Sequence, residues 1–347
     1  MPLRTAEESS DDYNMNPLST KRVLVTGAAG FIGSHLTERL LGLGAYVRAL
    51  LRYDSQNRLG HLADLSNRDK IEIVRGDLKD PEAVRSAVNG CEYVFHLGAL
   101  IGIPFSYQNP TDYVQTNVVG TLHVLNACRD AGVTRLIHTS TSEVYGTAQF
   151  VPITLAHPRC GQSPYAASKI GADALVESYA RAFALPAVIL RPFNTYGPRQ
   201  SPRAVIPTII RQALTGNVIR LGATDPTRDF LYVADTVSGF IGAAVSDLPP
   251  GTELHIGTGV ETSIGDVVRI VGVILGKPLD VVTDPQRIRP AQSEVERLCC
   301  DYSKARDLTG WTPTVDVKSG ITRVIEWMTK QTAASHADRV THEQYTT

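Results

Sequence analysis

Apolar runs alternate with helical patterns along the first part of the chain, and the apolar runs do not alternate with polar residues as half-buried strands do. The strands that we expect are 22–26, 46–51, 71–75, 93–97, 135–139 and 187–191. The helices that we expect between them are 34–43, 81–89, 112–131 and 166–183. Continuous apolar strands separated by helices predict a parallel sheet that helices cover on both faces. The predicted fold class is therefore α/β, a Rossmann-like doubly wound parallel sheet.

The pattern changes beyond Pro192, where loops rich in Pro, Gly and Arg separate shorter elements. We expect helices there near 205–215, 236–244, 264–275 and 318–332. We therefore predict one domain over 21–192 and a smaller region over 193–330, some segments of which return to the first domain. The polar residues 1–20 are expected to be a disordered leader and 331–347 a polar tail.

Composition excludes several classes of protein. Lys and Arg number 34 against 35 Asp and Glu, so no net field favours nucleic acid or an anionic membrane. No apolar run approaches the ~20 residues that a membrane span needs, and the first residues lack the apolar centre of a signal peptide. The five cysteines are odd in number and show no C-x-x-C spacing. This pattern favours a reducing, cytoplasmic location and predicts neither a disulfide framework nor a metal site.

Three glycines follow the first predicted strand and open the first helix. Gly27, Gly30 and Gly33 have the spacing G-x-x-G-x-x-G, with Phe31 and Ile32 between the last two. Such a turn leaves the amides and the positive dipole end of the helix free to hold a pyrophosphate. We expect all five residues to bind a dinucleotide.

The end of the second predicted strand indicates which dinucleotide. The position that usually carries a ribose-binding carboxylate falls at Leu51, and Arg52 follows it with Arg58 nearby. A missing carboxylate beside an arginine suits a 2′-phosphate, so NADP is favoured over NAD. Alternatively, Arg52 is a solvated loop residue and Asp54 takes the ribose hydroxyl.

Two further strand ends contribute to the same predicted site. Asp77 and Leu78 follow the third strand and are expected to flank the adenine. Three residues follow the fourth strand and are expected to line the phosphates and the nicotinamide ribose: Leu97, Gly98 and Ala99. His96, just before them, is either part of this wall or a core histidine.

A candidate catalytic group follows the fifth strand. Tyr165 and Lys169 stand four residues apart at the start of a predicted helix, on one face of it. The ammonium stabilises a phenolate, so Tyr165 is suited to take a proton from a sugar hydroxyl. The fifth strand ends near Thr141, which is placed to hydrogen-bond the reacting hydroxyl.

These motifs occur in one order along the chain. They are the glycine turn, His96–Ala99, Thr141–Gly146, Tyr165–Lys169 and Arg191–Arg199. Together they resemble the extended short-chain dehydrogenases/reductases, the nucleotide-sugar epimerase/dehydratase group. The resemblance implies an NAD(P) cofactor that stays bound and is recycled, and hydride-transfer roles for Thr141, Tyr165 and Lys169. It also implies a nucleotide diphosphate sugar substrate, a UDP- or GDP-hexose. The substrate-binding residues that we expect are Ser106, Asn194, Arg203, Arg228, Arg289 and Glu294.

The resemblance further implies a homodimer, paired through the helices at 112–131 and 166–183. The apolar positions Val114, Leu122, Leu175 and Val176 fit either that interface or the core.

Glu143 favours one reaction within the group, a 4,6-dehydratase. After C4 of the hexose is oxidised, the C5–H is acidic and a carboxylate can remove that proton while water leaves C6. Glucose dehydratases carry Asp before this glutamate, whereas this chain has Ser142, so the acid for the C6 hydroxyl is either a water held by Ser142 or Glu143 itself. The segments 147–153 and 287–295 look most like N-acetylglucosamine-nucleotide 4,6-dehydratases of legionaminic acid pathways. The alternatives are a C4 epimerase, a uronate decarboxylase or a cofactor-sensing protein without catalysis.

Overall fold

The computed structural model describes residues 16–285 and 295–344. Within them the chain forms two compact units. Unit 1 comprises 16–139, 168–190 and 240–253, and unit 2 comprises 140–167, 191–239, 254–285 and 295–344. This division differs from a single boundary after residue 192, because 140–167 falls in unit 2 while 240–253 falls in unit 1.

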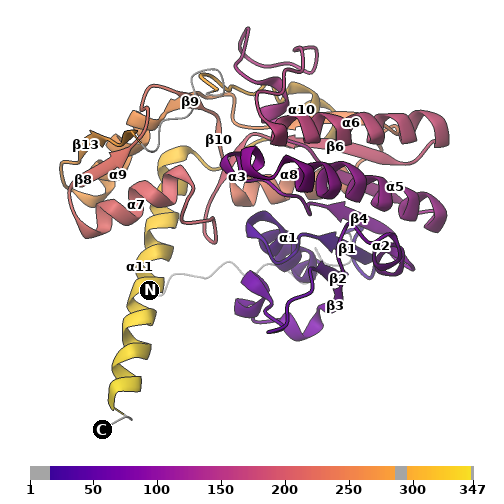
Figure 1. The fold of residues 1–347 in the computed structure, drawn as a ribbon, viewed down its shortest axis with the longest axis horizontal. Coiled ribbons are helices and arrows are strands. Elements are labelled where there is room, and N and C mark those ends of the chain that lie inside the picture. The colour runs from indigo at the N-terminus through magenta and orange to yellow at the C-terminus, as the bar shows by residue number, and fades with distance from the viewer. Residues whose placement is uncertain (1–15, 286–294, 345–347) are drawn as a thin grey trace, which may run out of the picture. The chain divides into compact units, whose positions relative to one another are not determined.

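A seven-stranded sheet has the order β11-β6-β5-β4-β1-β2-β3; Figure 1 labels β6, β4, β1, β2 and β3. Its strands are β1 (Arg22–Thr26), β2 (Tyr46–Leu51), β3 (Glu72–Arg75), β4 (Tyr93–His96), β5 (Arg135–Thr139), β6 (Ala187–Pro192) and β11 (Thr252–Ile256). Neighbouring strands from β6 to β3 are parallel. The strand order reverses between β1 and β4, and ligands of such sheets bind beyond the carboxyl ends of the strands at this point. The predicted α/β fold is confirmed.

Helices separate the strands of this sheet along the chain, and α8 leads into β11. They are α1 (Phe31–Gly42), η2 (Gly60–Asp64), η3 (Arg68–Lys70), α2 (Pro81–Val88), α3 (Ile103–Gln108), α4 (Pro110–Tyr113), η4 (Val114–Val119), α5 (Gly120–Ala131), α6 (Pro164–Phe183) and α8 (Val233–Val245). The helix α2 shows why these elements begin where they do. Its first residue is Pro81, and the Asp80 carboxylate accepts hydrogen bonds from the amides of Glu82 and Ala83.

The predicted helix over 112–131 is interrupted, because η4 is a π-helix. Within η4, the side chain of Asn117 is buried and pairs with the backbone of Leu100, accepting from its amide at 2.8 Å and donating to its carbonyl at 2.9 Å. A π turn in an otherwise α-helical segment often marks a functional site.

The core of unit 1 lies between the sheet and the helices α2, α5 and α6. Leu24, Val94 and Ile189 from the strands are fully buried there together with Val124 of α5 and Val176 of α6. Val176 is therefore a core residue and not an outward one.

Unit 2 contains short strands, several short helices and one long helix, α11. They are η5 (Ser142–Tyr145), β7 (Asn194–Tyr196), α7 (Val205–Thr215), β8 (Val218–Leu221), β9 (Thr227–Arg228), β10 (Phe230–Tyr232), β12 (Thr262–Ser263), α9 (Ile264–Leu275), β13 (Asp280–Thr283), α10 (Ser303–Thr309) and α11 (Val317–Gln344). Three two-stranded sheets pair β7 with β10, β9 with β12 and β8 with β13. The buried Asp229 carboxylate joins two loops of unit 2, because it accepts hydrogen bonds from the backbone amides of Thr258 and Gly259 in one and of Cys300 in the other.

One expectation about the chain ends is corrected, namely how far the predicted leader extends. Leu18 is fully buried, so the predicted leader does not extend to residue 20; residues 1–15 lie outside the described residues. The helix α11 continues to Gln344, so most of the predicted tail is helical. Residues 331–344 contain no Gly or Pro that would end the helix. Of the helices that the structure describes, none combines the length and apolarity that crossing a membrane requires.

Candidate functional site

The glycine turn of unit 1 leaves the start of α1 open to a ligand. Gly27 has φ +71°, which favours glycine, and Gly30 precedes the helix in an extended conformation. Among the described residues no side chain caps this helix, so the first-turn amides, including those of Phe31 and Ile32, have no side-chain acceptor. These amides and the helix dipole suit an anion.

The turn is packed so closely that side chains are excluded. A Cβ on Gly33 would lie 2.2 Å from the carbonyl oxygen of Gly27, and one on Gly27 would lie 2.9 Å from the amide nitrogen of Gly98. Gly30 is exposed, and a Cβ there would meet only the Gly27 carbonyl, at 3.2 Å. The turn therefore fits the pyrophosphate of a dinucleotide, which needs backbone close to its oxygens.

A buried polar chain fixes the neighbouring wall of the turn. Thr121 donates its hydroxyl hydrogen to the Asn117 carbonyl and so accepts from Nε2 of His96 at 3.1 Å. The Nδ1 of His96 then accepts from the Thr26 hydroxyl at 2.8 Å, and Thr26 in turn accepts from the Gly98 amide at 2.9 Å. Burial, with the charges of His138 and Lys169, holds the pKa of His96 well below its usual value. His96 is thus a satisfied neutral core histidine that ties the end of β4 to the end of β1.

Other predicted cofactor residues lie against the same wall. Leu78 lies against Gly98, since a Cβ placed on Gly98 would come within 2.9 Å of the Leu78 Cδ1. Asp77 accepts a hydrogen bond from the Lys79 amide at 3.0 Å. Leu97, Gly98 and Ala99 are half-buried after β4. The structure therefore brings the predicted residues after β1, β3 and β4 to one end of the sheet.

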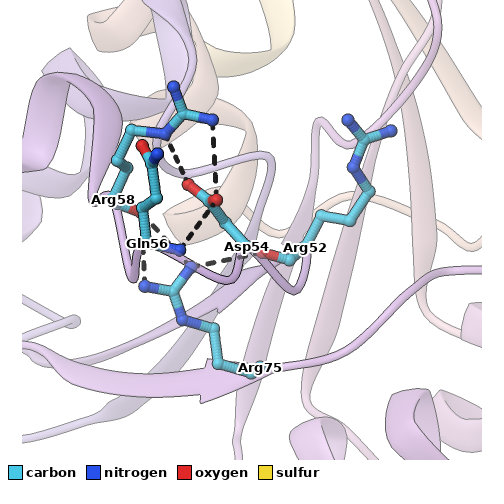
Figure 2. Close-up of polar contacts among 5 residues, drawn as sticks. All are labelled: Arg52, Asp54, Gln56, Arg58 and Arg75. Atoms are coloured by element: carbon cyan, nitrogen blue, oxygen red, sulfur yellow. Dashed lines mark hydrogen bonds and ion pairs between the residues drawn. The ribbon is translucent and has the colours of Figure 1, made fainter.

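Arginines gather beyond the end of β2 (Figure 2). Leu51 is buried, and the exposed Arg52 side chain extends away from the ion pair that Arg58 forms with Asp54 at 2.6 Å. That pair holds the pKa of the Asp54 carboxyl below its usual value. Arg75 donates hydrogen bonds to the carbonyls of Arg52 and Arg58.

This loop adjoins the glycine turn. The amide of His61 donates to the Ala29 carbonyl at 3.3 Å, and Gly60 lies against Ala29. Arg75 was missed from the sequence because its relevance comes from the pairing of β3 with β2, in which it stands beside Leu51.

In unit 2 the predicted carboxylate stands on a single helical turn. Thr141 caps η5, and its hydroxyl accepts from the Glu143 amide at 3.2 Å. Ser142 is buried, whereas Thr141 and Glu143 are half-buried. Thr141 and Glu143 are therefore held together by local backbone geometry.

The helix α6 carries the predicted tyrosine and lysine one turn apart. Tyr165 is 8% exposed and Lys169 is 4% exposed. The Lys169 ammonium donates to the Thr139 carbonyl at 2.6 Å, at the end of β5. A buried ammonium needs such partners, and this one fixes the side chain at the end of that strand.

The expected substrate residues occupy varied environments. Asn194 is the first residue of β7, and its backbone amide donates a hydrogen bond to the Asp229 carbonyl. Arg228 is 8% exposed on β9 and donates to the Thr227 carbonyl, whereas Arg203 is exposed before α7. Ser106 is fully buried in α3, and its hydroxyl donates to the Ile103 carbonyl within the same helix.

The remaining two expected substrate residues, Arg289 and Glu294, lie outside the described residues.

Comparison with known proteins extends these observations. A family model described as GDP-mannose 4,6 dehydratase matches residues 24–324. Over 88% of its length the chain is 34% identical to a UDP-glucose 4-epimerase of Mycolicibacterium smegmatis, covering 98% of that protein. It is equally identical to a dTDP-glucose 4,6-dehydratase of Streptomyces antibioticus, with 88% and 91% of the two chains covered.

Among solved structures, the chain is likewise similar to a 4,6-dehydratase and a 4-epimerase. A dTDP-glucose 4,6-dehydratase of Streptomyces venezuelae with NAD and TYD bound has a TM-score of 0.79 at 31% identity, with 89% of this chain and 97% of that one covered. A UDP-glucuronic acid 4-epimerase of Bacillus cereus in complex with UDP-glucuronic acid and NAD has a TM-score of 0.82 at 29% identity, with 89% and 99% covered.

Two glycines of α1 test the cradle. Gly33→Ala is expected to weaken dinucleotide binding at least about tenfold, because the new methyl group displaces the Gly27 carbonyl. Binding is measured by calorimetric titration of cofactor-free protein. Gly42→Ala is the control, since a Cβ there meets no described atom within 4 Å. Unchanged affinity in Gly33→Ala would contradict the assignment.

Proposed function

Because the chain belongs to the GDP-mannose 4,6 dehydratase family, within the NAD-dependent epimerases and dehydratases of the short-chain dehydrogenase/reductase type, we propose that it is a nucleotide-sugar 4,6-dehydratase. The observation that carries this proposal is Glu143 on η5, a half-buried carboxylate two residues past Thr141. Its substrate is a UDP- or GDP-hexose, and the neighbours that hold UDP-sugars favour UDP.

The first step oxidises C4 of the hexose. Thr141 and Tyr165 hydrogen-bond the C4 hydroxyl, and the Tyr165 phenolate takes its proton. The ammonium of Lys169 favours that phenolate electrostatically. The glycine turn would hold the dinucleotide, which when bound would supply a hydride acceptor that is recycled and not consumed.

The second step eliminates water. Glu143 removes the C5 proton, which the C4 carbonyl has made acidic, and the C6 hydroxyl leaves as water after gaining a proton. That proton comes from Glu143 itself or from a water held by Ser142. The hydride then reaches C6 and solvent supplies a proton to C5, while the proton that Tyr165 took from the C4 hydroxyl passes to solvent, so the net change is loss of one water.

Product analysis tests this reaction. Proton NMR of the protein with UDP- and GDP-hexoses is expected to show a new C6 methyl doublet and a C4 ketone. Glu143→Gln is expected to lower product formation about a hundredfold or more, the contribution of a general base. It should still oxidise C4 and so accumulate reduced nicotinamide absorbance.

Tyr165→Phe is the comparison variant, since it should lose both the oxidation and the product. Normal turnover in Glu143→Gln would overturn the proposed role of the carboxylate.

A C4 epimerase is the second candidate, supported by the 34% identity to a UDP-glucose 4-epimerase. The same NMR spectra separate the two reactions, because an epimer keeps its C6 oxygen and shows no methyl doublet.

For the cofactor we propose NADP, although the solved neighbours hold NAD. The support comes from the loop after β2. Arg52 is exposed after β2, and Arg75 holds the backbone of Arg52 and Arg58 (Figure 2). Asp54, the carboxylate nearest to a ribose-binding position in the sequence, is paired with Arg58. Guanidinium groups suit a 2′-phosphate, whereas a free carboxylate there would repel it.

Arg52→Ala is therefore expected to lower NADP affinity about tenfold or more while NAD affinity is kept, since one charge-assisted phosphate contact is lost. Titration of cofactor-free protein with each dinucleotide measures this, and the mass of the cofactor released from purified protein checks it. Arg68→Ala is the control, an exposed arginine beside Asp69. Equal losses for both dinucleotides would contradict the NADP proposal.

We further propose a homodimer formed through the segments containing Val114 and Leu122, apolar residues that are exposed and half-buried. Light scattering should give about twice the 37.6 kDa of one chain. Val114→Asp should shift the mass toward one chain, whereas Leu308→Asp, at nearly the same exposure on α10, should not. A monomeric wild type would refute this proposal.

A cytoplasmic location is supported by the five cysteines, all of which are free thiols.

A further inference from the structure

Tyr145 ends the single turn of η5 that also carries Glu143. Side chains two positions apart on a 3₁₀-helix leave its axis about 120° apart. Tyr145 is 1% exposed, whereas Glu143 is half-buried. The turn thus has a buried anchor on one side and a carboxylate on another.

The buried phenol contacts two basic side chains. Its oxygen lies 2.6 Å from Nε2 of His255, on β11, and accepts from Arg191, at the end of β6, over 3.4 Å. The Arg191 guanidinium also lies 5.7 Å from the centre of the Tyr145 ring. Arg191 is fully buried and His255 is 1% exposed, so these contacts are shielded from water.

The hydrogen bonds of this cluster have one consistent direction. A guanidinium only donates, so Tyr145 accepts from Arg191 and gives its own hydrogen to His255. That donation requires a neutral imidazole. Burial, reinforced by the charge of Arg191, lowers the pKa of His255 to about 3 and keeps it neutral.

The rest of the turn is also fixed. Gly146 ends η5 with φ +63°, and a Cβ on it would lie 2.6 Å from Oε1 of Gln162 and 2.7 Å from the Cys160 carbonyl. The Cys160 amide donates to the Val144 carbonyl at 2.8 Å. The backbone of η5 therefore has little room to move, and the phenol fixes its rotation.

We propose that Tyr145 is a positioning residue for Glu143, held in place by Arg191 and His255. The inference rests on the proposed dehydratase function and adds to it the residue that orients the Glu143 carboxylate. Proton removal from C5 requires the carboxylate oxygen near hydrogen-bond distance of that proton, and errors of about 1 Å are costly. A buried anchor two residues away supplies that precision, although it touches no substrate.

Tyr145→Phe tests the anchor, because it keeps the ring and removes the hydroxyl. Elimination is expected to slow about tenfold, whereas C4 oxidation and the KM of the sugar stay near the wild-type values. Elimination is followed by the methyl doublet, and oxidation by reduced nicotinamide in a single turnover. The expected signature is accumulated reduced nicotinamide.

Three variants complete the design. His255→Gln keeps an acceptor for the phenol and should retain most of the elimination rate, whereas His255→Leu should lose it as Tyr145→Phe does. Tyr179→Phe is the control, since it removes a phenol hydrogen bond to Asn126 on α5. Thermal melting of every variant shows whether the fold is intact.

The outcomes are distinct. If the wild type gives no 4-keto-6-deoxy product, the proposed function fails and this inference fails with it. If the wild type gives that product but Tyr145→Phe slows oxidation and elimination equally, or slows neither, the inference alone is overturned.

Discussion

The close approach of the β1 turn to the end of β4 is the constraint on which the proposed dinucleotide site depends. Gly27 lies so near Gly98 that a Cβ on Gly27 would come within 2.9 Å of the Gly98 amide nitrogen. The approach is held by one buried chain of hydrogen bonds through Thr26 and His96, in which each group has one defined donor or acceptor role. Because these strands meet where the sheet order reverses, the same constraint that packs the core also opens the start of α1 to a pyrophosphate.

Two of the buried histidines, His96 and His255, serve as neutral connectors rather than as charged groups. Burial is the leading cause of the lowered pKa in each, and a neighbouring cation adds to it. A neutral imidazole offers one donor and one acceptor: His96 uses both, with Thr121 and Thr26, whereas His255 accepts from Tyr145 through Nε2. In unit 1 this orders the wall of the predicted cofactor site. In unit 2 it anchors the turn that carries Glu143, so the proposed chemistry of the carboxylate depends on residues that are themselves chemically inert.

Much of the fold followed from local pattern. The strands 22–26, 46–51 and 135–139 were predicted to the residue, as were the helices 205–215 and 264–275, because continuous burial and helical spacing leave a direct trace in the sequence. The helix over 112–131 was predicted as continuous, yet η4 interrupts it. That π turn accompanies the pairing of Asn117 with Leu100, which lies 17 residues away and leaves no periodic signal.

By itself the sequence determined the parallel α/β architecture, the glycine spacing, and the placing of Tyr165 and Lys169 one turn apart on a helix. These depend on contacts within a few residues, so spacing and composition report them. Only the tertiary structure decided that Arg75 supports the loop of Arg52, that His96 is satisfied in the core, and that Tyr145 meets Arg191 and His255. Those contacts join residues from 17 to 110 positions apart. They are set by strand pairing and burial, which bring distant side chains together without any repeat that a single sequence displays.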